Sequence, residues 1–95
     1  MVKVTLESNK ICMEGHARHS VNGQDIVCSA ISALTCTFIN SMHDIANINL
    51  YYEIHDGFTY ISWESQMNET GKILLKSFVL GLEGINDQYN CIEFN

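Results

Sequence analysis

The apolar stripe between Val27 and Ile45 constrains the fold of this chain more than any other feature. Apolar side chains recur there at intervals of three and four residues: Val27, Ile31, Leu34, Phe38, Met42 and Ile45. This spacing is that of one face of an α-helix. Asp25 precedes the stripe and is a preferred N-cap residue, so we expect the helix to run from there to about Ala46.

Runs on either side of this helix carry the patterns of β-strands. Residues 2–7 alternate apolar and polar side chains, and Asp56-Gly57 separates two aromatic, β-branched runs as a two-residue hairpin turn would. We expect strands at residues 2–7, 11–15, 48–55, 58–64 and 89–94.

A second helix is predicted between the last two strands, from Met67 to about Ile85. Its inward-facing residues are expected to be Ile73, Leu74, Phe78 and either Leu82 or Ile85. The element order is then β-β-α-β-β-α-β, which belongs to the α+β class. We expect residues 1–95 to form one small single domain, in which two helices pack on a mixed β-sheet.

Charge and apolar content limit the functions that this domain can have. Eleven acidic residues oppose five scattered basic ones, which gives a formal charge of -6. A nucleic-acid partner is therefore disfavoured, and a basic peptide or protein is favoured. The start of the chain lacks the apolar core of a signal peptide, and no apolar run approaches the roughly 20 residues of a membrane span. We expect a cytoplasmic protein whose four cysteines are free thiols.

Cys28 and His16 are the residues most suited to covalent chemistry. With Asp25 as the N-cap, Cys28 is the third residue of the helix, where unpaired N–H groups and the helix dipole favour a thiolate. His16 follows the second strand and is the nearest base along the chain. A cysteine and a histidine in contact suffice for nucleophilic acyl transfer, and the N–H groups at the same helix end could bind the oxyanion.

Two other interpretations use the same atoms. Cysteine is often buried, histidine often ends a strand and Asp25 is most simply a cap, so a structural role is the commoner one for each residue alone. A zinc site would draw on four nitrogen and sulfur ligands: Cys12, His16, His19 and Cys28. The sequence has no C-x2-C knuckle to favour zinc, and spacing alone leaves these alternatives open.

A longer motif includes both residues. It consists of Gly15-His16-Ala17, a glycine at position 23, Asp25-Ile26-Val27-Cys28 and then Ser29-Ala30-Ile31-Ser32-Ala33-Leu34. With the cysteine twelve residues after the histidine, this pattern resembles the ribosomal-processing cysteine protease family, Prp or YsxB-like. The resemblance covers essentially the whole chain in length and element order, and its specificity lies in residues 15–34.

The resemblance implies a reaction and a partner. Members of the family are small homodimeric α+β proteases of certain Gram-positive bacteria and their relatives. They remove an N-terminal extension from large-subunit ribosomal protein twenty-seven, so the expected substrate is a basic ribosomal protein precursor. We expect neither a metal nor a cofactor, and neither a membrane nor a direct nucleic-acid partner.

The resemblance also assigns site residues by position. His16 matches the family's catalytic histidine, Cys28 its nucleophile and Asp25 the motif aspartate, a candidate to orient His16. His16 and Cys28 thus form a candidate catalytic dyad. The segment that follows His16 matches a mobile lid over the substrate: Ala17, Arg18, His19, Ser20, Val21, Asn22, Gly23 and Gln24. Ser29 and Ser32 are assigned to substrate binding.

This chain departs from the family pattern at two places. Ser29 stands where alanine is commoner, and residues 18–22 replace a loop that often has smaller or more aromatic residues. The second departure concerns substrate preference and leaves the dyad intact. The alternative function is a non-catalytic ribosome-assembly module of the same fold that binds the same basic tail without cutting it.

Overall fold

The fold follows the predicted order of elements. The structure, a computed structural model, describes residues 1–16, 24–64 and 66–95. Its elements are β1 (Val2–Glu7), β2 (Lys10–Gly15), α1 (Gln24–Asp44), β3 (Tyr51–His55), β4 (Phe58–Ser62), α2 (Glu69–Tyr89) and β5 (Ile92–Phe94). Residues 17–23, which hold most of the expected lid, lie outside the described residues.

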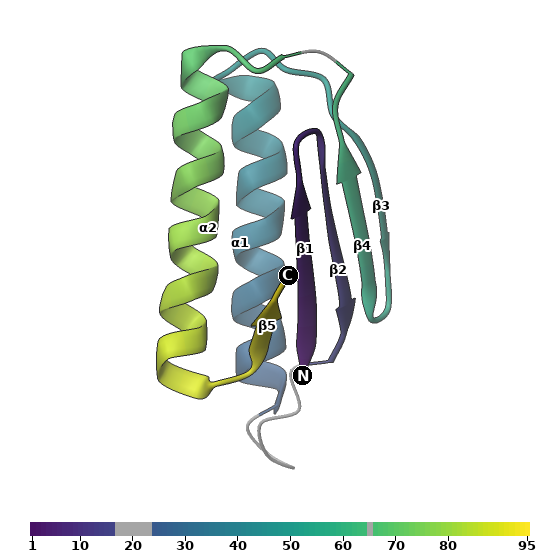
Figure 1. Ribbon diagram of the computed structural model, residues 1–95, viewed down its shortest axis with the longest axis vertical. Helices are drawn as coiled ribbons and strands as arrows, with labels where there is room; N and C mark the ends of the chain where they lie inside the picture. The colour runs from purple at the N-terminus through teal and green to yellow at the C-terminus, as the bar shows by residue number, and fades with distance from the viewer. Residues whose placement is uncertain (17–23, 65) are drawn as a thin grey trace.

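Within the described residues, five strands form one sheet in the order β3-β4-β2-β1-β5. β1 pairs with β2 in the antiparallel and with β5 in the parallel direction, and β4 is antiparallel to both β2 and β3. Figure 1 shows the two helices side by side and antiparallel, next to the sheet. The expected α+β class, with two helices on a mixed sheet, is confirmed.

The alternating strand residues and the helical stripe meet in one core. In β1 and β2, Val4 and Ile11 are buried, whereas Lys3 and Glu14 are exposed, so one face of the sheet packs on the helices and the other carries polar residues. The largest fully buried side chains come from both helices and three strands: Val4, Ile11, Val27, Met42, Ile61 and Leu82.

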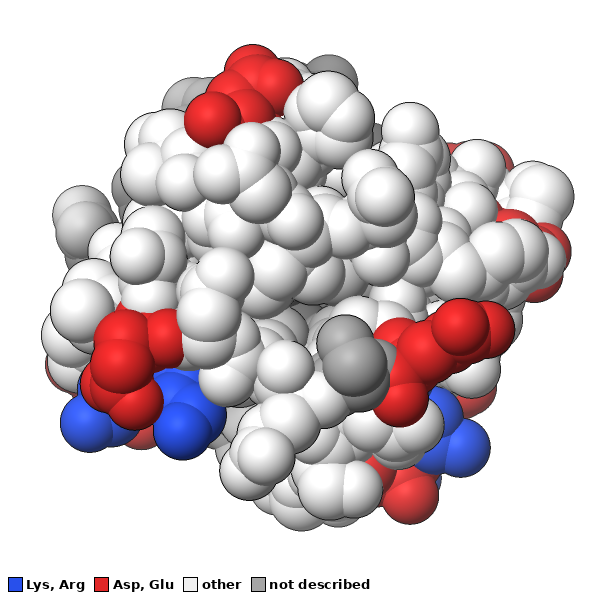
Figure 2. Space-filling model, turned by 90° about the horizontal axis from the view of Figure 1, so that it is seen from above, with Lys and Arg blue, Asp and Glu red and all other residues white. Residues whose placement is uncertain are grey.

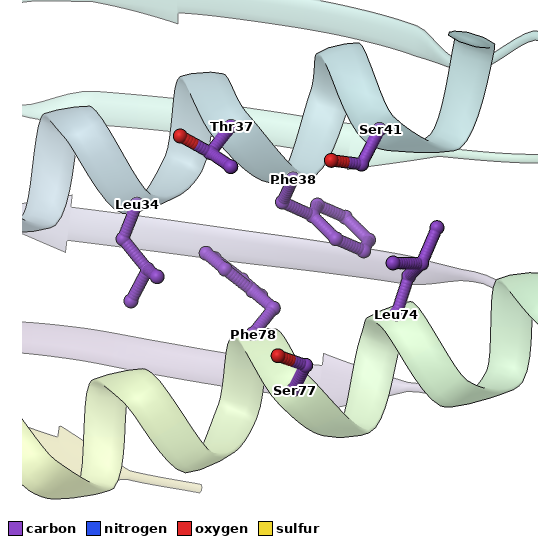
Figure 3. A pocket seen from close by; sticks show the side chains of 7 residues that line it. All are labelled: Leu34, Thr37, Phe38, Ser41, Leu74, Ser77 and Phe78. Atoms are coloured by element: carbon purple, nitrogen blue, oxygen red, sulfur yellow. The ribbon is translucent and has the colours of Figure 1, made fainter. Parts of the chain in front are cut away.

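The two helices pack closely against each other. The rings of Phe38 and Phe78 stack with their centroids 4.6 Å apart. They border a small cavity of about 60 Å³, which Figure 3 shows with its lining residues Leu34, Thr37, Phe38, Ser41, Leu74, Ser77 and Phe78. At Gly81 the helices approach each other closely, since a Cβ there would lie 2.6 Å from Cδ2 of Leu34.

Asparagines close both ends of α2. Oδ1 of Asn68 accepts a hydrogen bond from the Gly71 N–H at 2.8 Å, and its Nδ2 donates to the Ala46 carbonyl at 2.9 Å. At the other end Asn90 takes a left-handed conformation with φ 50°, and its N–H donates to the Asn86 carbonyl at 2.7 Å. The helix is thus tied at its start to the residues that follow α1.

Several predicted boundaries are wrong. The second helix begins at Glu69 and continues to Tyr89, so the last strand is only Ile92–Phe94. The left-handed Asn90 sets this end, because it turns the chain out of the helix directly before β5. The central helix begins at Gln24 and ends at Asp44, and the middle strands are shorter than predicted at their outer ends.

Two residues expected to face inward are exposed. Ile45 is 61% exposed because α1 ends before it, and the N–H groups of both Ile45 and Ala46 bond back to the Ser41 carbonyl as the chain leaves the helix. Ile73 is 63% exposed. It lies off the stripe of α2, whose buried members Gly71, Phe78 and Leu82 follow the helical repeat.

Helix α1 is more apolar than expected. By length and composition alone, its segment Ile26–Asp44 could cross a membrane, and less than a third of that segment is buried. The segment supplies Val27, Phe38 and Met42 to the same core that the sheet covers. It therefore occupies the place of a core helix, and it also leaves apolar side chains such as Ile26 on the surface.

Candidate active site

The backbone of His16 is fixed between two neighbouring elements. β2 ends at Gly15, which has φ +104°, and a Cβ there would overlap the carbonyl oxygen of Met1. The Gly15 N–H donates to the Gly57 carbonyl, and the Met1 nitrogen donates to the His16 carbonyl, each at 2.9 Å. Only glycine suits this position, and it turns the chain so that His16 lies between β1 and the β3–β4 turn.

The imidazole of His16 rests against that turn. A Cβ built on Gly57 would lie 2.8 Å from Nε2 of His16 and 3.2 Å from Cε1. Gly57 has φ +74° and follows Asp56 in the predicted two-residue hairpin turn. The contact is possible because Gly57 has no side chain.

Cys28 lies in the second turn of α1. The helix begins at Gln24, so Cys28 is its fifth residue and not the third, and Asp25 lies inside the helix rather than at its cap. The N–H of Cys28 therefore belongs to the regular helical ladder. Its side chain leans back toward the first turn, as side chains do in an α-helix, so the thiol still points toward the end that favours an anion.

A chain of contacts brings Cys28 and His16 to the same end of the molecule. The Met1 nitrogen bonds to His16, and the next N–H, of Val2, donates to the Cys91 carbonyl at 2.8 Å. Burial is the main cause of the raised pKa of the Cys91 thiol, and its coulombic interaction with Cys28 adds to the rise. In Figure 1 this is the end where β1 begins and α1 starts.

Within the described residues, the structure has no hydrogen bond between His16 and Cys28. Cys28 is half-buried and packs against the core. The two groups are therefore brought to one end of the fold without being joined there.

The zinc interpretation is not supported. Cys12 alternates with the buried Ile11 and Met13, so it lies on the sheet face away from α1 and Cys28. Its Sγ donates to Oε1 of Glu14 at 3.6 Å. Among the described residues, which do not include His19, no group of three side chains could hold a metal ion.

The remaining predicted residues differ in their placement. Ser29 and Ser32 are both exposed on α1, and Ser32 follows Cys28 by one helical turn, on the same side of the helix. Gln24 is the first residue of α1. Sequence reasoning missed the contributions of Met1, Gly57 and Cys91. The Asp56-Gly57 pair signalled a hairpin, but not that its turn would reach His16.

Charged side chains elsewhere on the surface agree with the acidic composition. Figure 2 looks down on the end opposite Met1 and shows several separate acidic groups with basic side chains at only two places in that view. The whole chain carries six more acidic than basic residues.

Comparison with known proteins decides the family, since residues 1–92 match the cysteine protease Prp family. The chain belongs to that family. It is also 27% identical over 82 residues to the ribosomal processing cysteine protease Prp of Staphylococcus aureus, with 84% of this chain and 77% of the relative aligned. By membership, the chain is a cysteine protease.

Solved structures of Prp from S. aureus share its fold. One, an essential ribosomal processing protease in complex with a covalently linked product peptide, has a TM-score of 0.84 at 26% identity, over 99% of this chain and 95% of that one. Another, with a substrate peptide, has a TM-score of 0.82 at 25% identity over the same shares. The chain thus shares its fold with a Prp protease whose structure has been solved with bound peptides.

Proposed function

We propose that this Prp protease is an endopeptidase that removes the N-terminal extension of large-subunit ribosomal protein twenty-seven during ribosome maturation. Cys28 is its nucleophile and His16 its general base and acid. The observation that carries the proposal is the GHA and DIVC motif pair, whose histidine and cysteine lie at one end of a fold that matches Prp along its length. The S. aureus structure with a covalently linked product peptide supports a covalent route.

The mechanism follows from these two groups. His16 accepts the thiol proton of Cys28, and the sulfur attacks the carbonyl carbon of the scissile peptide bond. The tetrahedral oxyanion lies near the start of α1, where N–H groups lack partners within the helix. His16 then donates the proton to the leaving amine, and water hydrolyses the thioester to release the new carboxylate.

The other predicted residues surround this centre. We assign residues 17–24 to a lid that closes over bound peptide, and Ser29 and Ser32 to contacts with it. Lid closure excludes water and brings the reacting groups together. We assign Asp25, in the first turn of α1, to the orientation of His16.

The partner is a basic precursor of a ribosomal protein. The formal charge of -6 attracts such a chain and steers it toward the enzyme. The substrate-peptide complex of the S. aureus relative supports a peptide partner. Since ribosomes mature in the cytoplasm, we place the enzyme there.

We also propose that the enzyme is a homodimer. The support is the low burial of α1, in which less than a third of the apolar segment Ile26–Asp44 is buried, together with exposed apolar side chains such as Ile26 on α1 and Leu80 on α2. Sedimentation of the purified protein at micromolar concentration tests this. A single species of twice the chain mass is expected, and a monomer refutes the proposal.

The test of the proposed function is cleavage of a peptide that spans the extension junction, followed by mass spectrometry. Cys28→Ala is expected to lower kcat by about 10³-fold or more, and His16→Ala by about 10²- to 10⁴-fold. Cys36→Ala is the matched control, because Cys36 is an exposed thiol on the same helix. Full cleavage by Cys28→Ala refutes the proposal.

One observation favours the alternative, a module that binds the precursor without cutting it. No hydrogen bond joins His16 and Cys28 in the described part of the chain. In the same assay the alternative predicts that the wild type binds the peptide with no new product mass. Product formation that depends on Cys28 excludes it.

A further inference from the structure

The turn between β3 and β4 contacts the backbone of Gly15, directly before His16, and the side chain of His16. The carbonyl of Gly57 accepts the hydrogen bond of Gly15, directly before His16, at 2.9 Å. The Cα of the same glycine faces the ring, and the nearest ring atoms to a Cβ built there are Nε2, Cε1 and Cδ2 of His16. The tip of the imidazole therefore points at Gly57.

This contact leaves no room for a side chain. A Cβ on Gly57 would lie 2.8 Å from Nε2 of His16. This distance is shorter than the van der Waals contact distance between a carbon and a nitrogen atom. The neighbouring elements are tied by the β2–β4 and β3–β4 hydrogen bonds, and the backbone of His16 is held by Met1. A larger residue at position 57 would thus displace the ring rather than the turn.

We propose that Gly57 is a positioning residue for the proteolytic reaction. Because residue 57 has no side chain, the imidazole of His16 can occupy the space beside the turn. The proposal rests on the proposed role of His16 as the base. A general base acts only within hydrogen-bond reach of the proton that it accepts, and a displacement of about 1 Å lowers a rate by up to about 10²-fold. Gly57 has no side chain that could take part in the reaction, and it acts through the position of His16.

Three variants separate the crowding from backbone strain. Gly57→Ala introduces both, because φ is +74° there. Gly57→Asn introduces the Cβ in a residue that tolerates this conformation, so it keeps the fold if alanine does not. Asn47→Ala is the matched control for strain alone, since Asn47 is exposed, has φ 57° and follows the far end of α1.

Two measurements report on the ring. The first is kcat and KM for the junction peptide, with each variant shown to be folded by circular dichroism. The second is the Cε1–H signal of His16 in a carbon–proton correlation spectrum. For Gly57→Ala and Gly57→Asn we expect kcat to fall about 10- to 100-fold, with KM within about twofold, and the His16 signal to move. For Asn47→Ala we expect neither change.

A folded Gly57→Asn with the wild-type kcat and an unmoved His16 signal overturns the proposal, as does a rise in KM with kcat unchanged. The role of His16 is tested separately. If His16→Ala cleaves at the wild-type rate, the proposed function of His16 is wrong. If His16→Ala is inactive and Gly57→Asn is not impaired, only the role of Gly57 fails.

Discussion

Helices α1 and α2 have the same length, yet they differ in what holds them and in what they carry. α2 is closed by Asn68 at its start and by Asn90 at its end, and its buried stripe faces the core. α1 begins directly after residues 17–23 and has the half-buried Cys28 in its second turn. We infer that α2 chiefly stabilises the fold, while the start of α1 carries Cys28, the nucleophile proposed above. Changes in α2 should therefore alter stability with little effect on the Cys28 thiol.

The largest loss of stability is expected from Phe78→Ala. Phe78 is buried and stacks on Phe38, so its removal takes away apolar contact and enlarges the existing cavity between the helices. We expect the free energy of unfolding to fall by about 3–5 kcal/mol. Urea unfolding followed by the fluorescence of Trp63 measures it. Phe78→Leu is the control and should lose less, and a loss below about 1 kcal/mol for alanine would contradict the account.

Two glycines on α2 give a sharper comparison. A Cβ at Gly81 would lie 2.6 Å from Leu34 of α1, whereas a Cβ at Gly84 would meet nothing within 4 Å. Gly81→Ala is expected to lower the free energy of unfolding by about 1–3 kcal/mol through overpacking. Gly84→Ala should raise it by up to about 1 kcal/mol, the gain in helix propensity. Equal effects in urea unfolding would show that the two helices are not in close contact at Gly81.

A smaller effect is expected at the cap of α2. Asn68→Ala removes both the acceptor for the Gly71 N–H and the donor to the Ala46 carbonyl, and should cost about 1 kcal/mol. Asn68→Asp keeps the acceptor and loses only the donor, so its loss should be smaller. Thermal unfolding at matched pH ranks the two, and an alanine variant as stable as the wild type would be evidence against the cap.

The smallest effect concerns a thiol outside the site. Burial raises the pKa of the Cys12 thiol, and the hydrogen bond to Glu14 and its charge raise it further. A raised pKa means less thiolate at neutral pH, so alkylation of Cys12 by iodoacetamide should accelerate only at higher pH than for an ordinary thiol. Glu14→Gln should speed the reaction at pH 8. An unchanged rate, read by peptide mapping, would contradict this electrostatic explanation.

The sequence predicted the elements better than their ends. The first strand and the central helix could be predicted because the apolar residues in 2–7 and 27–42 recur with the period of a strand and of a helix. Burial of one face of each element imposes that period. The left-handed Asn90 that ends α2 depends on a single backbone conformation, and asparagine occurs in many others. At its start, α2 is capped by Asn68, so the helix begins two residues after the predicted Met67.

The sequence supplied the candidate site residues but not their arrangement in the fold. The motif identified His16 and Cys28, and it did so through resemblance, because spacing alone left structural roles open. The contact between His16 and Gly57 joins residues far apart in sequence, and it depends on how β2, β3 and β4 pair. Local patterns do not encode such a contact. The helix starts two residues earlier than predicted, which places Cys28 in the second turn of α1 and not in the first.

The most direct test of the account is to trap the covalent intermediate. Wild-type protein is mixed with the junction peptide, quenched in acid within the first turnovers, and measured by intact mass and then by peptide mapping. The account predicts an acyl adduct with the mass of the N-terminal product, carried by Cys28 and absent from Cys28→Ala. An adduct on Cys12, Cys36 or Cys91, or turnover by Cys28→Ala, would contradict it.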